Sequence, residues 1–413
     1  MNGRWRTAVP TATLALSGAH VGSDFAQGAV PAVGAVLVAR GELDITEVGV
    51  LVFAVNAGSS ALQPLLGVLA DRVSWPWMAS IGVLIAGAGL SGMGVRTSFP
   101  LMLVATIVCG IGIALFHPDA GRLVTATAPP AVAVRAMSVF ALGGNAGFAL
   151  GPIIAAPVAA ETGHAGVVAL GLIPIAAVAP LGWATYLARH GNRQSDLNPD
   201  TRHSGQDSPI SDTPRNQWRP FTQLGVVITL RSTGYYSLQS FVPAFLIASY
   251  SVDTGWATRG LTVLVVAGTL ATMVGGWRAR REPQMMLISW PLAGVAIATT
   301  LLLLAPTYPF AIAALAIAGA ATFAGFSPSI TLAQRYLPTR TALASAVAFG
   351  LAPGLGSAAA IPITHLAQHT GYAPALLILA ALPLIALPLA LRLRPAAPAA
   401  SRGQEHAETL SAN

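Results

Sequence analysis

Long apolar stretches alternate with short polar breaks along nearly the whole chain. A membrane-spanning α-helix needs about 17–25 mostly apolar residues, and dividing the sequence at its polar breaks predicts twelve such helices. The first six are expected at residues 11–38, 47–70, 78–95, 101–126, 136–160 and 166–188. The second six are expected at residues 221–249, 258–277, 285–304, 310–335, 343–367 and 373–393.

A polar segment separates the two groups of six helices. Residues 190–220 are rich in Asp, Ser, Asn, Pro and Arg and have no hydrophobic periodicity, which is typical of a solvated linker. The sequence therefore predicts an N-terminal six-helix half at 1–189, a cytoplasmic linker at 190–220 and a C-terminal half at 221–394. Residues 395–413 are expected to form a disordered cytoplasmic tail.

Composition agrees with lipid as the solvent. Hydrophobic residues make up 54% of the chain and charged residues only 9%, whereas about 25% of a soluble domain is charged. The net charge of +7 comes from arginine alone and forms no compact basic patch, which argues against binding to nucleic acid. Cys109 is the only cysteine, so disulfides and thiolate metal sites are excluded.

The positions of the arginines predict the orientation. If both termini are cytoplasmic, eighteen arginines lie inside and three (Arg40, Arg96 and Arg259) lie outside, while Arg231 falls within a helix. This difference follows the positive-inside rule. Arginine in place of lysine and abundant alanine suggest a GC-rich bacterial source, so we expect a multi-pass protein of the bacterial inner membrane.

The two halves resemble each other in sequence. Phe116-His-Pro-Asp has a counterpart 210 positions later in Phe326-Ser-Pro-Ser, and Thr162-Gly-His-Ala has one 208 positions later in Thr370-Gly-Tyr-Ala. Two six-helix halves of related sequence are the arrangement of major facilitator transporters, whose binding site lies between the halves. The predicted fold class is therefore an all-α integral membrane protein with two pseudo-symmetric halves.

Ionisable residues inside spanning helices are costly and are functional candidates. His20, Asp24 and Gln27 are spaced to share one face of the first helix. Asp24 is expected about 18 Å from the cytoplasmic end, near the middle of the membrane, at 1.5 Å per residue. An aspartate at this depth could load and release a proton during transport. The alternative is a structural hydrogen bond to a neighbouring helix.

The seventh helix offers a cation at a similar depth. Arg231 is expected to share one face with Tyr235 and Gln239. We hypothesise that Arg231 either pairs with Asp24 or receives an anionic group of the substrate, since guanidinium binds phosphate and carboxylate groups bidentately. A purely structural ion pair is the alternative.

The fourth and fifth helices supply further candidates. Pro118 is expected to kink the fourth helix next to His117. Asp119 and Arg122 are spaced to form a pair that could act as a gate or a proton relay. The alternative is that they only cap the end of the helix. In the fifth helix, small residues form a stripe that permits close helix packing and ends at a proline. Asn145 lies within this stripe and is a possible hydrogen-bond donor to a cavity. The packing residues are Gly143, Gly147, Gly151 and Pro152.

Several motifs resemble known families. Gly67-Val-Leu-Ala-Asp71-Arg72 resembles the loop signature of the major facilitator superfamily, and the stripe ending in Gly151-Pro152 resembles its antiporter motif. Within that superfamily the chain is similar to the fosmidomycin-resistance exporters. The stretches that carry this similarity are residues 20–27, 62–67, 75–77, 116–119, 143–145 and 333–338.

The resemblance implies a proton-coupled exporter of drugs or small organic anions that acts as a monomer and needs no cofactor or metal. Proton coupling is expected to involve Asp24, Asp119, His20 and His117. Substrate binding is expected at Gln27, Gln63, Asn145, Arg231, Tyr235 and Gln239. The cytoplasmic gate is expected at Gly67, Asp71, Arg72 and Arg122. Ser23 and Asp119 depart from the residues usual in the family, asparagine and glutamate.

Two other classes of function are compatible with parts of the sequence. A proton symporter or a facilitator could use the same residues to import an organic anion. A more remote alternative is an intramembrane metalloenzyme built on His20, Asp24, His117 and Asp119. The sequence contains no His-Glu-x-x-His motif, and a catalytic site would leave the second half without a task. We therefore expect a transporter and not an enzyme.

Overall fold

The computed structural model describes residues 9–73, 77–95, 98–183, 186, 215–279 and 281–395. Most of the predicted linker, the predicted tail, Trp75, Pro76 and Arg96 lie outside these residues. Within the described residues every regular element is a helix and there is no strand. The helical fold predicted from the sequence is confirmed.

The helices fall into two groups, which we call the N-half and the C-half. The N-half contains α1 (Thr11–Ala39), α2 (Ile45–Ala61), α3 (Gln63–Arg72), α4 (Met78–Val95), α5 (Phe99–Thr127), η2 (Pro130–Val132), α6 (Ala133–Leu170) and α7 (Leu172–Ala176). The C-half contains α9 (Trp218–Tyr250), α10 (Thr254–Arg278), α11 (Gln284–Leu303), α12 (Tyr308–Ala324), α13 (Phe326–Tyr336), α14 (Thr341–Ala346), η4 (Val347–Leu351), α15 (Ala352–Thr370) and α16 (Tyr372–Leu391).

Ten helical stretches of the described chain are long and apolar enough to span a membrane. One of them, Pro130–Trp183, has 54 residues and would measure about 80 Å as a straight helix, far more than a bilayer core of about 30 Å. The chain reverses direction at Gly163, whose φ of 64° is a value that glycine adopts readily. The stretch therefore supplies two spans. The more polar α9, with 33 residues, is also long enough to span. These spans agree with the twelve predicted helices.

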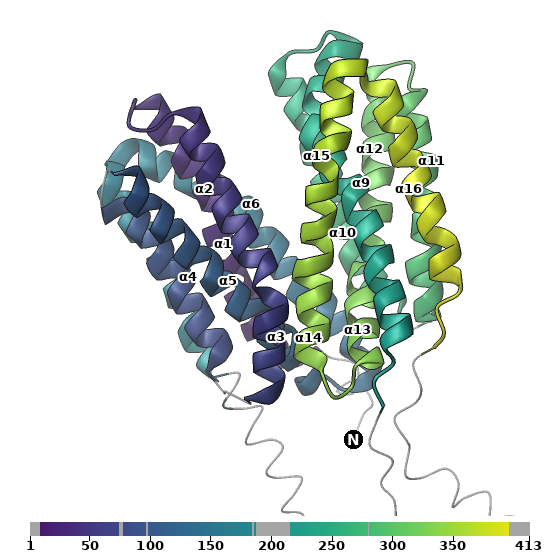
Figure 1. Cartoon of the computed structure of the whole chain (residues 1–413), viewed down its shortest axis with the longest axis horizontal. Helices are drawn as coiled ribbons and strands as arrows, with labels where there is room; N and C mark the ends of the chain where they lie inside the picture. Colours follow the sequence, from purple (N-terminus) through teal and green to yellow (C-terminus); the bar gives the residue numbers. More distant parts are fainter. Residues whose placement is uncertain are drawn as a thin grey trace, which may run out of the picture.

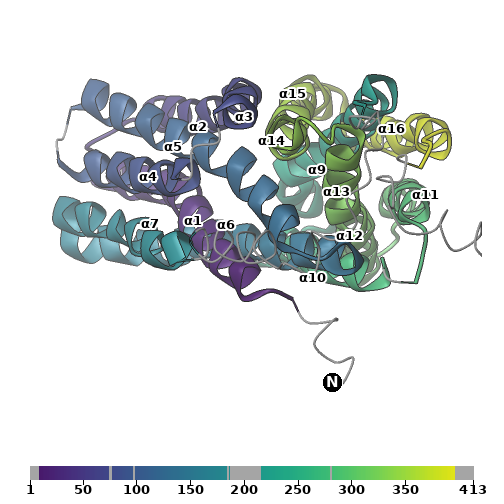
Figure 2. The same cartoon turned by 90° about the horizontal axis from the view of Figure 1, so that it is seen from below.

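The two halves stand side by side (Figure 1). They meet where α3 faces α14, and their ribbons diverge toward the opposite end. Figure 2 views the molecule from the end at which the halves meet. We call this end the closed end and the other the open end. Arginines gather at helix termini of the closed end, whereas Arg40 and Arg259 lie at the open end.

The glycine stripe of α6 lies directly against α1. A Cβ atom at Gly143 would lie 2.3 Å from the carbonyl oxygen of Ser17, and one at Gly147 would lie 2.2 Å from that of Val21. Side chains at these positions would force the helices apart, because real carbon and oxygen atoms do not approach so closely. The stripe therefore fixes α1, which carries Asp24, against α6.

Three helices predicted as continuous are interrupted. The predicted helix at 47–70 is divided at Leu62, the one at 310–335 at Gly325, and the one at 343–367 contains the π-helical turn η4. Each interruption lies shortly before a proline, namely Pro64, Pro328 or Pro353. Proline has no amide hydrogen to donate to the preceding turn, which weakens the helix there. By contrast, α5 runs through Pro118 without a break.

A glycine-to-alanine exchange tests the packing of α1 on α6. We expect Gly147→Ala to lower the thermal midpoint of the purified protein in detergent, because overpacking costs about 1–3 kcal/mol. Gly225→Ala in α9 is the matched control, since no atom lies within 4 Å of the added Cβ. There the better helix propensity of alanine should leave the midpoint unchanged or raised. Equal midpoints for the two variants would contradict this packing role.

Candidate functional site

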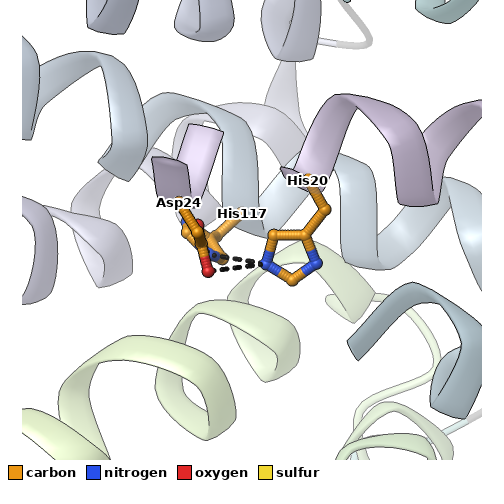
Figure 3. Close-up of side chains that lie close together, drawn as sticks. All are labelled: His20, Asp24 and His117. Carbon is orange, nitrogen blue, oxygen red and sulfur yellow. Dashed lines mark hydrogen bonds and ion pairs between the residues drawn. The ribbon is translucent and has the colours of Figure 1, made fainter. Parts of the chain in front are cut away.

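Three titratable side chains converge in the N-half. His20 and Asp24 lie one turn apart on α1, and His117 reaches them from α5 (Figure 3). The Nε2 atoms of the two histidines are 3.1 Å apart. Asp24 Oδ2 lies 3.2 Å from His20 Nε2, and Asp24 Oδ1 lies 3.3 Å from His117 Nε2. We call these residues the histidine–aspartate cluster.

Backbone carbonyls orient both imidazoles. His20 Nδ1–H donates to the carbonyl oxygen of Phe140 at 2.8 Å, and His117 Nδ1–H donates to that of Ile113 at 2.9 Å. A carbonyl oxygen only accepts, so both Nδ1 atoms carry hydrogen. In neutral imidazoles both Nε2 atoms are then acceptors, and they face a carboxylate that also accepts when ionised. Hydrogen bonding within the cluster therefore needs protons beyond those on Nδ1.

The surroundings leave little free space. The side chains of His20 and His117 are 4% and 8% exposed, and that of Asp24 is 16% exposed. Phe140 stacks on the His20 ring at 4.1 Å between ring centroids. A Cβ atom at Gly144 would lie 2.4 Å from His20 Nε2 and 2.7 Å from Asp24 Oδ2. Gly144 is thus needed for the cluster itself, a role that sequence reasoning missed because it assigned the neighbouring glycines to packing.

The same atoms are of the kinds that bind transition metals. Two imidazole nitrogens and a carboxylate oxygen lie within 4.8 Å of one another, and zinc accepts such ligands. The two oxygens of Asp24, however, face different imidazoles. The separations of 3.1–3.3 Å among these nitrogens and oxygens are also those of hydrogen bonds.

Asp119 lies two residues beyond His117 but outside the cluster. Its Oδ1 accepts hydrogen bonds from Arg122 Nη2 at 2.5 Å and Nε at 3.2 Å, so the predicted pair is formed. Its Oδ2 accepts from the amide of Ala79 at 3.3 Å, in the first turn of α4. The carboxylate is 1% exposed. Asp119 therefore joins α5 to the positive N-terminal end of α4.

Arg231 of α9 lies in the C-half and is 7% exposed. Pairing with Asp24, one of the two alternatives expected from the sequence, is not formed in this conformation, because no carboxylate of the described chain lies within 4.0 Å of the Arg231 nitrogens. Its Nη1 donates to Ser329 Oγ at 3.3 Å. The guanidinium lies over the ring of Phe326, 5.9 Å from the centroid. Arg231 is thus a buried cation held by a hydroxyl and an aromatic ring.

A pocket opens beside this cation. Its lining combines the guanidinium with hydroxyl groups and aromatic rings, and the lining residues are Arg231, Ser232, Tyr235, Tyr236, Thr322, Phe323, Phe326 and Pro353. A buried cation with nearby hydroxyl donors and apolar walls suits a small anion that also carries apolar atoms. Tyr235 thus lies where the sequence predicts it, beside Arg231.

Phe349 of η4 connects the two halves of the site. Its ring centroid lies 6.2 Å from that of His20 and 5.9 Å from that of His117. It also lies 5.7 Å from the ring of Phe326, over which Arg231 sits. Neither phenylalanine was predicted as a site residue. Phe326 had a signal, as the repeat counterpart of Phe116, whereas Phe349 stands in an apolar stretch with no local mark.

The remaining amides predicted to bind substrate are dispersed. Gln27 donates to Asn56 Oδ1 at 2.7 Å and thus points to α2 and away from the cluster. Gln63 is buried against Gly350, where an added Cβ would lie 2.2 Å from its Oε1. Asn145 and Gln239 are half-buried, and the described chain supplies no hydrogen bond to either side chain.

The predicted gate residues lie at the closed end. Both oxygens of Asp71 accept backbone hydrogen bonds across the halves, from the amides of Ala342 and Leu343 at 2.9 Å each. A Cβ at Gly67 would lie 2.8 Å from Ala346 Cβ, so α3 packs closely on α14. Arg72 is exposed and lies outside this contact. The carboxylate of the N-half thus caps the first turn of a helix in the C-half.

Comparison with known proteins identifies relatives across nearly the whole chain. The chain is 27% identical over 376 residues to the Fosmidomycin resistance protein of Escherichia coli (strain K12), covering 90% of each. It is 25% identical over 370 residues to the uncharacterized MFS-type transporter YfnC of Bacillus subtilis (strain 168), covering 89% of each.

Solved structures share the fold. FucP, a major facilitator transporter in the outward conformation, matches with a TM-score of 0.67 at 14% identity, over 93% of this chain and 99% of FucP. The proton:xylose symporter XylE matches with a TM-score of 0.68 at 15% identity, over 92% of this chain and 95% of XylE. The family model of the Major Facilitator Superfamily matches residues 11–361. The chain is therefore a multi-pass membrane transporter that belongs to the major facilitator superfamily.

Proposed function

We propose that this transporter exports a drug or small organic anion across the bacterial inner membrane in exchange for protons, acting as a monomer. The observation that carries the proposal is the pairing of two buried sites. The histidine–aspartate cluster of the N-half can hold protons, and Arg231 of the C-half is a buried cation beside a pocket. Similarity to a protein named for fosmidomycin resistance supports export and a phosphonate-like anion.

Protons are carried by the cluster in this proposal. When two protons are bound, one on each Nε2 atom, each histidine donates one hydrogen bond to Asp24. When only one proton is bound, one of the two histidine–Asp24 contacts joins two acceptors. Release of these protons leaves like lone pairs 3.1–3.3 Å apart in a buried site, which is unfavourable and drives rearrangement. Asp119, the fourth predicted group, contributes through its pair with Arg122 at the cytoplasmic side.

Substrate binds at Arg231 in this proposal. A phosphonate, phosphate or carboxylate can accept two hydrogen bonds from the guanidinium, and Tyr235 lines the same pocket. The anion replaces the missing carboxylate partner of Arg231. Since protons and anion bind in different halves, each can favour a different arrangement of the halves, which is what exchange requires.

The positive-inside rule assigns the closed end to the cytoplasm, because the arginines gather there. Both termini are then cytoplasmic, and this conformation is the outward-facing one. FucP, whose structure is described as outward, shares the fold. Substrate leaves from the open end in this state, and the reverse state requires the contact between α3 and α14 to part.

Transport in everted membrane vesicles tests the exporter. With an inside-acid gradient, we expect the protein to accumulate fosmidomycin, and Asp24→Asn to abolish gradient-driven accumulation because the cluster loses its charge change. Glu282→Gln is the control, since this carboxylate pairs with Arg278 at a helix end, away from the cluster. Accumulation that persists in Asp24→Asn would refute the cluster as the coupling site. Gradient-driven uptake into intact cells would favour symport instead.

Replacement of Arg231 tests the anion site. We expect Arg231→Gln to raise the half-saturating fosmidomycin concentration roughly ten- to hundredfold, since hydrogen bonds to charged groups contribute about 1.5–3 kcal/mol. Arg231→Lys should retain part of the affinity because it keeps the charge but loses the bidentate geometry. Arg335→Gln, an exposed arginine on α13, should leave the concentration dependence unchanged. Equal effects of all three changes would exclude Arg231 as the anion site.

Removal of the inter-half cap tests the gate. In Asp71→Ala we expect a cysteine placed at Ser345, next to Gly121 of the N-half, to react faster with a maleimide. Loss of a cap costs about 0.5–2 kcal/mol, which shifts the equilibrium toward parted halves. Asp44→Ala is the control, because Asp44 caps α2 within the N-half. The natural Cys109 is buried and contributes little background. Unchanged labelling in Asp71→Ala would remove Asp71 from the gate.

A further inference from the structure

We infer that Phe349 shields the histidine–aspartate cluster from the closed end, so that the cluster exchanges protons with that side only after the two halves part. The inference rests on the proposed function for the meaning of the cluster. It adds a positioning residue, supplied by the other half of the molecule, that controls the access of protons to it.

Ring contacts place Phe349 against the cluster. Its ring meets the His20 ring nearly edge-on, with an interplanar angle of 84°. Its centroid also lies 5.8 Å from that of Phe140, the ring that stacks on His20. It also contacts the His117 ring at 5.9 Å. Among the ring contacts of the described chain, Phe349 is the one from the C-half that reaches both histidines.

The neighbours of Phe349 show which side of the cluster it covers. Gly121 lies one turn beyond His117 on α5, toward the closed end. A Cβ at Gly121 would lie 3.2 Å from Phe349 Cε2 and 3.0 Å from Ser345 Oγ. The Phe349 ring therefore lies between the cluster and the closed end and occupies space through which water would otherwise reach the cluster.

The backbone ties Phe349 to the gate. It lies in the π-helical turn Val347–Leu351, which continues directly from α14, the helix capped by Asp71. A π-helical turn places its side chains differently from an α-helical one and is frequent at functional sites. Pro353, four residues after Phe349, cannot donate to the Phe349 carbonyl, which favours the wider turn there. When α14 moves away from α3, Phe349 must move with it.

The charged and titratable groups around Phe349 come from three helices. Asp24 and His20 face it from α1 and His117 from α5, while Arg231 of α9 lies behind Phe326. Tyr236 of α9 is near enough to interact electrostatically with Asp24. The apolar ring thus separates the proton-holding groups from the cation of the anion pocket, and its departure opens the cluster toward the closed end.

Proton conductance of liposomes tests this role without any substrate. The purified protein is reconstituted, a pH gradient is imposed with a potassium–valinomycin clamp, and an internal dye reports the proton flux. We expect Phe349→Ala to leak protons several-fold faster than the unmodified protein, because the cluster then communicates with both sides at once. Phe349→Leu, which keeps an apolar side chain of similar reach, should restore most of the barrier.

Two further variants make the test decisive. The leak of Phe349→Ala should vanish in the double variant with Asp24→Asn, which shows that protons pass through the cluster. Phe241→Ala removes a buried ring of the C-half that has no ring contact with the cluster and should not leak. A leak equal to that of the unmodified protein, a leak that survives Asp24→Asn, or an equal leak in Phe241→Ala would each overturn the inference.

The outcome is separable from that of the proposed function. A leak through Asp24 in Phe349→Ala, together with no fosmidomycin-driven proton movement in the unmodified protein, would retain the shielding role and reject the exporter. Coupled transport that proceeds normally in Phe349→Ala would reject the shielding role and retain the exporter.

Discussion

A carboxylate inside a membrane protein must find its hydrogen-bond donors within the chain, because lipid supplies none. Two histidines lie within 3.3 Å of Asp24, one on its own helix and one on α5, and each can donate to it when its Nε2 atom is protonated. The arrangement depends on Gly144, which leaves room for the imidazole, and on the glycine stripe that fixes α6 beside α1. Much of the packing of the N-half can be understood as the support of this one buried charge.

The C-half solves a related problem in a different way. Arg231 has no carboxylate partner in the described chain and is held by Ser329 and the face of Phe326. Desolvating a guanidinium in this manner is costly unless an anion compensates for it. The N-half therefore places its buried carboxylate beside two histidines, whereas the buried guanidinium of the C-half has no carboxylate partner in the described chain. In the proposed function an anionic substrate supplies that partner.

The fold could be predicted from the sequence, because lipid requires long apolar helices and the apolar stretches mark them directly. The candidate site could be predicted only in part. His20 and Asp24 are marked by their spacing on one helix, but the approach of His117 depends on how α5 packs, which no local pattern encodes. Pairing with Asp24, one of two alternatives for Arg231, is not formed in this structure, since equal depth in two helices does not specify the distance between them. Phe349 left no signal, since an apolar residue in a spanning helix is expected everywhere.

The gathering of arginines at the closed end has one more consequence. Guanidinium stays protonated at every pH that a bacterium encounters, so these charges do not respond to the proton gradient across the membrane. Histidines and carboxylates are the groups that do respond, and the cluster concentrates three of them at one place. In the proposed function, the chain thus separates the charges that set its orientation in the membrane from those that sense acidity. Acid stress can alter the working state of such a protein while its insertion remains the same.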